Sequence, residues 1–223
     1  MDGDMDIVTD SMDLSKSFIR QLECCSSTLQ IHQAEIGDVG CVVWDAALVL
    51  AKYLELGHEK GSEDINGKKV IELGAGTGIV GLCAAIIGAN VVITDLPQFL
   101  PLMQLNIDNN KSSIHSGHIE ASVLSWNDEI DKLLPLPDYL IMSDVIYYEE
   151  GLDPLINVIK KLAGQDTSIL ISYEERTLGN KMSLIHRFLY DMQRDFRIKE
   201  IRQEDLDDVY RSDDIHVLRL KRK

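Results

Sequence analysis

The chain lacks the features that mark several specialised classes of protein. Its four cysteines include no Cys-x-x-Cys pair, so we expect free thiols rather than a disulfide framework or a thiolate metal site. Its apolar runs, such as residues 46–51 and 82–87, are much shorter than the roughly 20 residues that cross a bilayer. Residues 1–6 are acidic where a signal peptide has basic and apolar residues. We therefore expect a cytoplasmic protein without a membrane segment or a bound metal ion.

Basic residues are also scarce. The sequence has 22 Lys and Arg residues against 37 Asp and Glu residues, which gives a formal net charge of -15. Such a charge opposes binding to the phosphates of nucleic acids, and it favours encounter with a basic protein segment that displays a lysine. We expect a protein partner and no nucleic-acid partner.

The remaining composition is that of one ordinary globular domain. A hydrophobic share of 45% over 223 residues suits a single α/β domain with a packed core. Residues 1–13 are predicted to form a flexible acidic tail, and residues 14–223 the domain. Within it, alternating apolar residues flank Cys-Cys-Ser-Ser, which predicts a β-hairpin extension over residues 14–40.

Beyond the hairpin, the pattern alternates between helical and strand periodicity. Asp45 is placed to cap a helix that Gly57 is expected to end. The alternation that follows predicts βαβ units and a parallel sheet. The expected strands are 69–73, 90–95, 121–124, 137–144, 168–173 and 214–220, and the expected helices are 79–87, 98–109, 151–162 and 181–195.

A glycine-rich loop joins the first of these strands to its helix. Residues 70–78 read Val-Ile-Glu-Leu-Gly-Ala-Gly-Thr-Gly, a turn at which a nucleotide-like cofactor binds in open α/β sheets. The glycines at 76, 78 and 81 also match the dinucleotide fingerprint, and Asp95 could bind a ribose in either case. Glu72 and the tight Gly-x-Gly-x-Gly spacing favour a cofactor with a cationic amino acid moiety and no pyrophosphate.

A second group of functional residues follows the expected central strand. Asp144 and Tyr147 stand three residues apart at its carboxyl end. There the carboxylate can accept hydrogen bonds from an incoming amine, and the aromatic ring can line its channel. A dehydrogenase has no obvious need for this pair.

Further motifs extend along the chain. They are Val42-Val43-Trp44-Asp45, Thr94-Asp95-Leu96, Asn106-x-x-x-Asn110, Trp126 and Tyr173-Glu-Glu-Arg-Thr. Together with the glycine loop and the Asp-x-x-Tyr motif, they resemble the seven-β-strand methyltransferases that act on protein lysines. The resemblance covers roughly residues 14–221.

The resemblance implies a fold, a cofactor and site residues. The fold would be a Rossmann-like, seven-stranded, mostly parallel sheet, and the enzyme would use S-adenosylmethionine and release S-adenosylhomocysteine. Asp144 and Tyr147 would be catalytic. With Glu72, the expected cofactor-binding residues are Trp44, Gly74, Ala75, Gly76, Asp95, Trp126 and Ser143. Ser143 departs from the alanine expected in relatives, which leaves a backbone contact unaffected.

The resemblance also suggests a substrate. Residues 210–216, Tyr-Arg-Ser-Asp-Asp-Ile-His, are similar to members that methylate the valosin-containing AAA ATPase, so that ATPase is the expected partner of a monomeric enzyme that adds up to three methyl groups. A heat-shock chaperone or an elongation factor is the alternative substrate. Two other interpretations stay open at this point: a non-catalytic interaction protein on the same fold, and an NAD-dependent oxidoreductase.

Overall fold

The computed structural model describes residues 14–35, 38–176 and 179–223. The predicted tail, residues 1–13, lies outside this range. The strands are β1 (Ser17–Cys24), β2 (Ser27–Ala34), β3 (Lys69–Leu73), β4 (Asn90–Asp95), β5 (His118–Val123), β6 (Tyr139–Ser143), β7 (Ser168–Glu174), β8 (Phe196–Glu200) and β9 (Ile215–Arg222). The helices are α1 (Asp45–Glu59), α2 (Ile79–Ile87), α3 (Leu100–Asn110), α4 (Glu149–Leu162) and α5 (Lys181–Met192).

Seven strands form the main sheet, in the order β5-β4-β3-β6-β7-β9-β8. The strands from β5 to β7 are parallel, and β9 runs antiparallel to both of its neighbours. Strands β1 and β2 form a separate antiparallel hairpin. The predicted mostly parallel sheet and N-terminal hairpin are therefore confirmed. Strand β8 has no counterpart among the predicted elements, although its apolar residues alternate with charged ones.

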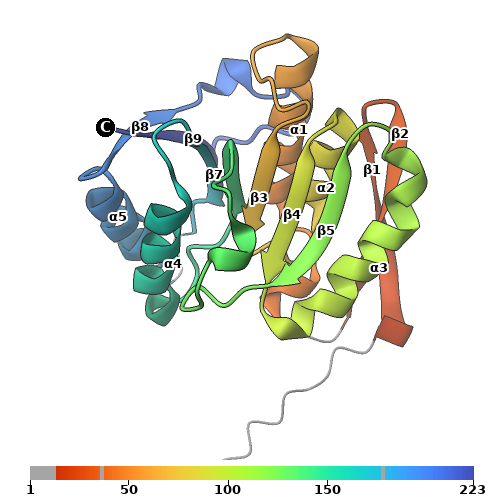
Figure 1. Ribbon diagram of the computed structural model, residues 1–223, viewed down its shortest axis with the longest axis horizontal. Helices are drawn as coiled ribbons and strands as arrows, with labels where there is room; N and C mark the ends of the chain where they lie inside the picture. The colour runs from red at the N-terminus through yellow and green to blue at the C-terminus, as the bar shows by residue number, and fades with distance from the viewer. Residues whose placement is uncertain (1–13, 36–37, 177–178) are drawn as a thin grey trace, which may run out of the picture.

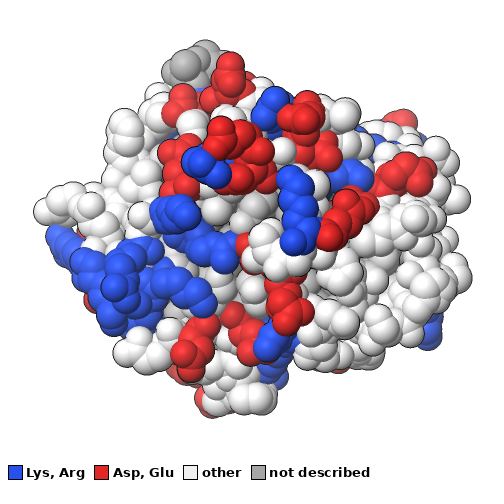
Figure 2. Space-filling model, turned by 90° about the horizontal axis from the view of Figure 1, so that it is seen from above, with Lys and Arg blue, Asp and Glu red and all other residues white. Residues whose placement is uncertain are grey.

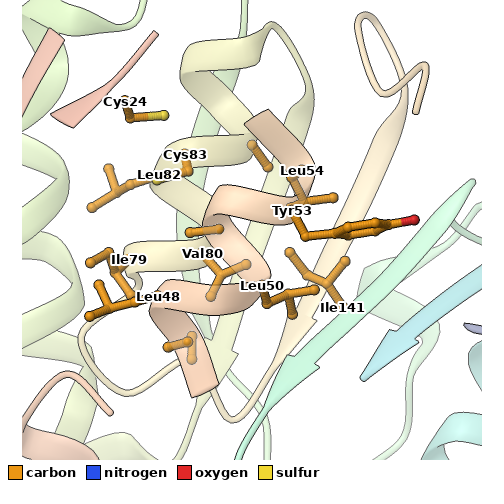
Figure 3. Close-up of a cluster of buried hydrophobic side chains, with 14 of the residues drawn as sticks. Cys24, Leu48, Leu50, Tyr53, Leu54, Ile79, Val80, Leu82, Cys83 and Ile141 are labelled. Carbon is orange, nitrogen blue, oxygen red and sulfur yellow. The ribbon is translucent and has the colours of Figure 1, made fainter. Parts of the chain in front are cut away.

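Helices cover both faces of the sheet (Figure 1). Residues of α1, α2 and α3 share one apolar cluster with the hairpin, whereas α4 and α5 pack in a second cluster on the opposite face. Strand β3 contributes to both, because Val70 faces the first cluster and Ile71 the second. Figure 3 shows side chains of α1, α2 and β6 meeting in the first cluster. Burial of each such side chain contributes about 1.5–3 kcal/mol to folding.

The expected limits of helix α1 are wrong at both ends. Trp44 is the N-cap residue, and Asp45 is already helical, with its carboxylate 3.4 Å from Arg20. The helix continues past Gly57 to Glu59. A Cβ atom at position 57 would lie 2.4 Å from Cγ of Glu63, so the glycine is needed for close packing rather than for ending the helix.

Two asparagine side chains attach the hairpin to α3. The Asn110 amide accepts a hydrogen bond from the Gln30 N–H at 2.8 Å and donates to the Gln30 carbonyl at 2.9 Å. Asn106 makes the same pair of bonds with His32, at 2.7 and 3.0 Å. Asn106 also donates to the carbonyl of Thr77 at 2.9 Å. The hairpin is therefore coupled through α3 to the glycine-rich loop.

The hairpin turn also brings two thiols close to helix α1. The ligand atoms of Cys24, Cys25 and Glu55 lie within 4.8 Å of one another. The Glu55 carboxylate already accepts hydrogen bonds from the Cys25 N–H at 2.6 Å and from Lys52 at 2.7 Å. Burial raises the pKa of Cys25 to about 12, so this thiol is neutral at physiological pH. The carboxylate thus fastens the turn to α1.

Charge is unevenly spread over the surface. Figure 2 shows Lys and Arg side chains gathered on the side where α5 and the C-terminus lie in Figure 1. Strands β8 and β9 on that side are rich in both residue types. The net charge of -15 therefore does not describe every face of the molecule. Among the helices of the described ranges, none is long and apolar enough to span a bilayer.

Candidate active site

The glycine-rich loop lies at the carboxyl end of β3, next to the point where the strand order reverses between β3 and β6. Gly76 has a φ of 54°, and a Cβ atom there would lie 2.6 Å from the carbonyl oxygen of Gly40. A side chain at this position would therefore be strained and would clash with backbone. The loop continues directly into α2, whose N-cap residue is Gly78.

Asp95, at the end of β4, holds this loop in place through hydrogen bonds. Its carboxylate accepts hydrogen bonds from the N–H groups of Gly76 and Leu96, both at 2.7 Å. Burial raises the pKa of Asp95 to about 6, although these two hydrogen bonds favour the ionised form. The carboxylate is therefore ionised at neutral pH and has lone pairs left for a ligand.

Glu72 lies elsewhere than expected. Its side chain is 1% exposed and does not line the cavity described below. One carboxylate oxygen accepts a hydrogen bond from the Gly81 N–H at 2.8 Å, and the other has no partner among the described residues. Burial raises the pKa of Glu72 to about 8. In this structure Glu72 holds the first turn of α2 against the end of β3.

Asp144 and Tyr147 follow β6. Asp144 has a φ of 57°, a conformation that costs a non-glycine residue about 1–3 kcal/mol and that clusters at functional sites. Its N–H donates to Ser172 at 2.8 Å, which extends the pairing of β6 with β7 by one residue. Tyr147 packs edge to face against Tyr148, with ring centroids 4.9 Å apart. The turn thus places a carboxylate and two aromatic rings at the carboxyl end of β6.

The two tryptophans come from opposite sides of the sheet edge. The Trp44 indole donates to the carbonyl of Val39 at 2.8 Å, which fixes its ring at the start of α1. Trp126, in the loop after β5, lies 3.5 Å from the place of a Cβ atom at Gly74 and 3.3 Å from one at Gly151. Gly151 therefore makes room for the Trp126 ring, whereas a Cβ atom at Gly74 would clash first with Val145, whose Cγ1 would lie 2.6 Å away.

These groups meet in one cavity of about 330 Å³, within the range of small-molecule sites. All predicted site residues except Glu72 line it: Trp44, Gly74, Ala75, Gly76, Asp95, Trp126, Ser143, Asp144 and Tyr147. The wall also includes Tyr148, which directly follows the Asp-x-x-Tyr motif. Phe99 and residues 38–40 belong to it too, and no sequence motif indicated them. The approach of residue 40 to the loop depends on the path of the chain between β2 and α1, and only the fold determines that path.

The chemistry of the wall suits a cationic nucleoside. Among the described residues that line it, every charged one is a carboxylate: Asp38, Asp95, Asp144 and Glu150. Aromatic rings supply flat apolar surface of the kind on which a nucleobase stacks. A positively charged sulfonium centre would gain from the carboxylates, whereas a pyrophosphate would be repelled by them.

The structure and sequence are similar to those of known methyltransferases. The sheet matches the Thermus thermophilus 16S rRNA N2 G1207 methyltransferase solved with AdoMet and guanosine, with a TM-score of 0.63, 16% identity, and coverage of 93% of this chain and 51% of that chain. It also matches the Synechocystis magnesium protoporphyrin IX methyltransferase solved with SAH, with a TM-score of 0.54, 16% identity, and coverage of 80% and 84%. At such identities, the match shows the fold alone.

Sequence comparison identifies the family. The chain is 36% identical to the protein N-lysine methyltransferase METTL21A of Danio rerio, over 77% of this chain and 75% of the relative. It is 39% identical to the EEF1A lysine methyltransferase 3 of Xenopus tropicalis, over 68% and 66%. A model of the lysine methyltransferase family matches residues 24–194. These matches favour the S-adenosylmethionine interpretation of the glycine loop over the dinucleotide one. The chain therefore belongs to the lysine methyltransferase family, which uses S-adenosylmethionine as its methyl donor.

Proposed function

We propose that the chain methylates a lysine side chain of another protein, with Asp144 and Tyr147 at the reacting end of the cavity. The observation that supports this best is that both residues share one cavity wall with Gly76 and Asp95. A cofactor held by the glycine loop and an amine held by Asp144 would then meet within one enclosed space. Bringing the two reactants together in this way supplies much of the catalysis in such a reaction.

The cofactor end of the cavity is assigned to the residues near the loop. Asp95 would accept hydrogen bonds from the ribose hydroxyls, and the backbone at 74–76 would lie against the amino acid moiety. Trp44, Trp126 and Ser143 line the remaining wall. S-adenosylmethionine would supply a methyl group on a positively charged sulfur, and transfer of its carbon to the neutral amine would break the carbon–sulfur bond and leave S-adenosylhomocysteine.

The amine end is assigned to Asp144 and the tyrosines. A lysine ammonium has a pKa near 10.4 and must lose a proton before it can react. Asp144 accepts hydrogen bonds from the amine and orients it. The rings of Tyr147 and Tyr148 attract an ammonium ion and exclude bulk water. Reduced solvation lowers the pKa of the bound amine, and its proton leaves to water.

For the substrate, we propose the valosin-containing AAA ATPase, on the strength of residues 210–216. A second candidate is supported by relatives: two of them, from Xenopus tropicalis and Mus musculus, are named EEF1A lysine methyltransferase 3. A substrate of the elongation-factor type is therefore the main alternative. A heat-shock chaperone is a third candidate.

The test is methyl transfer with purified proteins. The full chain and labelled S-adenosylmethionine are incubated with one candidate substrate in each reaction. The candidates are the ATPase, elongation factor 1A and a heat-shock chaperone. Label on the ATPase that disappears when one of its lysines is changed to arginine supports the first proposal. Label on the elongation factor alone would replace the ATPase as substrate, and label on none of the three would contradict both assignments.

A further inference from the structure

Arg176, two residues after β7, binds the carboxylate that is proposed to receive the substrate ammonium. Its guanidinium binds both oxygens of Asp144, with Nη1 3.0 Å from Oδ1 and Nη2 2.5 Å from Oδ2. The guanidinium carbon lies 4.9 Å from the ring centroid of Trp44 and 5.9 Å from that of Tyr147. A cation belonging to the chain itself thus lies between the carboxylate and two aromatic rings of the cavity wall.

This ion pair is well shielded from water. The Asp144 side chain is 8% exposed and that of Arg176 is 21% exposed. Bidentate bonds between an arginine and a carboxylate are among the stronger hydrogen bonds in proteins, and shielding strengthens them. A substrate ammonium and the guanidinium are both cations, so they would repel each other if both contacted Asp144. Binding of a lysine therefore requires the guanidinium to leave.

A second carboxylate is positioned to keep the guanidinium. Nη2 of Arg176 also donates to Oε2 of Glu174 at 2.7 Å. The Glu174 side chain is 30% exposed, so it lies nearer to solvent than Asp144. When the guanidinium moves off Asp144, it can stay paired with Glu174 and move outward without becoming an unpaired charge.

We propose that Arg176 occupies the ammonium site of the free enzyme, and that it passes to Glu174 when a substrate lysine arrives. The inference rests on the proposed function of Asp144. It makes Arg176 a specificity-determining residue. A free amine has only its own contact with Asp144 to displace the guanidinium, whereas a lysine in a docked protein gains from the rest of the interface. The enzyme would thereby discriminate against small amines.

The first test measures binding rather than turnover. The probe Nα-acetyl-L-lysine methylamide is titrated into the full chain saturated with S-adenosylhomocysteine and followed by NMR. Arg176→Gln is expected to bind the probe at least about tenfold more tightly than the wild type, a change equivalent to ~1.4 kcal/mol. The matched control is Arg187→Gln, which removes an arginine that is paired with Asp153 on the surface. This control should bind the probe like the wild type.

Two further experiments distinguish displacement of the Arg176 guanidinium from a general effect of charge on probe binding. Glu174→Gln should weaken probe binding about threefold because the guanidinium loses its second partner, whereas the neighbouring Glu175→Gln, with the same change in charge, should not. Ethylguanidinium should compete with the probe in Arg176→Gln, because it refills the vacated place. In the wild type it should compete much less.

The affinities of the wild type and Arg176→Gln for the probe test the proposal. Equal probe affinities in the wild type and Arg176→Gln, or weaker binding in the variant, would overturn the proposal. An unchanged affinity of Arg176→Gln for S-adenosylhomocysteine shows that the variant is folded. Failure of the proposed function has a different signature: the wild type would then methylate no protein, whatever the binding data show for Arg176.

Discussion

Replacing Glu72 with glutamine would show what the buried carboxyl group beneath the glycine loop does to stability. The substitution keeps the shape of the side chain and an oxygen that can accept the hydrogen bond from Gly81. It removes the proton equilibrium of a group that is 1% exposed and whose second oxygen has no partner among the described residues. The difference between the two proteins therefore isolates the effect of burying an ionisable group.

The expected size follows from the pKa. Burial raises the pKa of Glu72 from its ordinary value of 4.5 to about 8. A carboxyl group whose pKa is raised by folding contributes fully to stability below pH 4.5, and the contribution is lost as the pH rises towards 8. Keeping it protonated at pH 7 costs about 1.36 kcal/mol for each pH unit above 4.5, or about 3 kcal/mol. Glu72→Gln should therefore be about 3 kcal/mol more stable than the wild type at pH 7, and equally stable at pH 4.

Urea unfolding of both proteins between pH 4 and pH 8.5 measures this difference directly. Titrating groups that do not interact with Glu72 are present in both proteins and cancel in the subtraction. The charge of Asp95 adds to the raised pKa of Glu72, so this interaction is part of the measured difference. A difference in unfolding free energy that does not change with pH would refute the reasoning, as would a variant less stable than the wild type at pH 7. Calorimetry with S-adenosylhomocysteine tests the predicted contact between Glu72 and the cofactor. Because the side chain does not line the cavity, we expect the affinity to change less than about threefold.

Three further predictions concern the cavity. Asp144→Asn should lower kcat for methyl transfer by at least about 100-fold and leave the calorimetric affinity for S-adenosylhomocysteine within about threefold, because the lost contact is to the amine; an active variant would show that Asp144 is not catalytic. Gly76→Ala should destabilise the fold by about 2 kcal/mol or more in urea and weaken ligand binding, because its Cβ atom would lie 2.6 Å from the carbonyl oxygen of Gly40; an unchanged midpoint would contradict this. The affinity for S-adenosylhomocysteine should fall as the pH drops below about 6, the pKa of Asp95, because the protonated carboxyl accepts ribose hydrogen bonds less well. Asp95→Asn should bind weakly with no such pH dependence, and an identical profile in both proteins would rule out Asp95 as the titrating group.

Local sequence patterns were sufficient to predict the bounds of the elements at the centre of the fold. The observed bounds of β3, α2 and β4 coincide with the predicted 69–73, 79–87 and 90–95. In this segment, buried apolar runs alternate with glycine turns, so periodicity alone determines where each element starts and stops. Helix α1 differs because Gly57 is a standard stop signal in sequence but packs against Glu63 in the fold. Tertiary packing overrode the local preference there.

Sequence patterns likewise located some residues of the candidate site but not others. The proximity of Asp95, Asp144 and Tyr147 in one cavity could be predicted because carboxyl ends of parallel strands gather at one edge of a sheet, whereas their roles stay predictions. Glu72 has the right position in the sequence, yet its side chain points beneath the loop, and no pattern reveals which side of a turn a side chain takes. Arg176 belongs to a recognisable motif, but its contact with Asp144 spans 32 residues and exists only because β6 and β7 are neighbours.

The amide groups of Asn106 and Asn110 have a consequence for solubility. A strand at the border of a small sheet exposes hydrogen-bonding groups that other chains can use for aggregation. At Gln30 and His32, both backbone groups on that border of β2 are already taken by the two asparagines. Helix α3 thereby satisfies these backbone groups as a third strand would. At these two residues, β2 leaves no free backbone hydrogen-bonding group on that border for pairing with another chain.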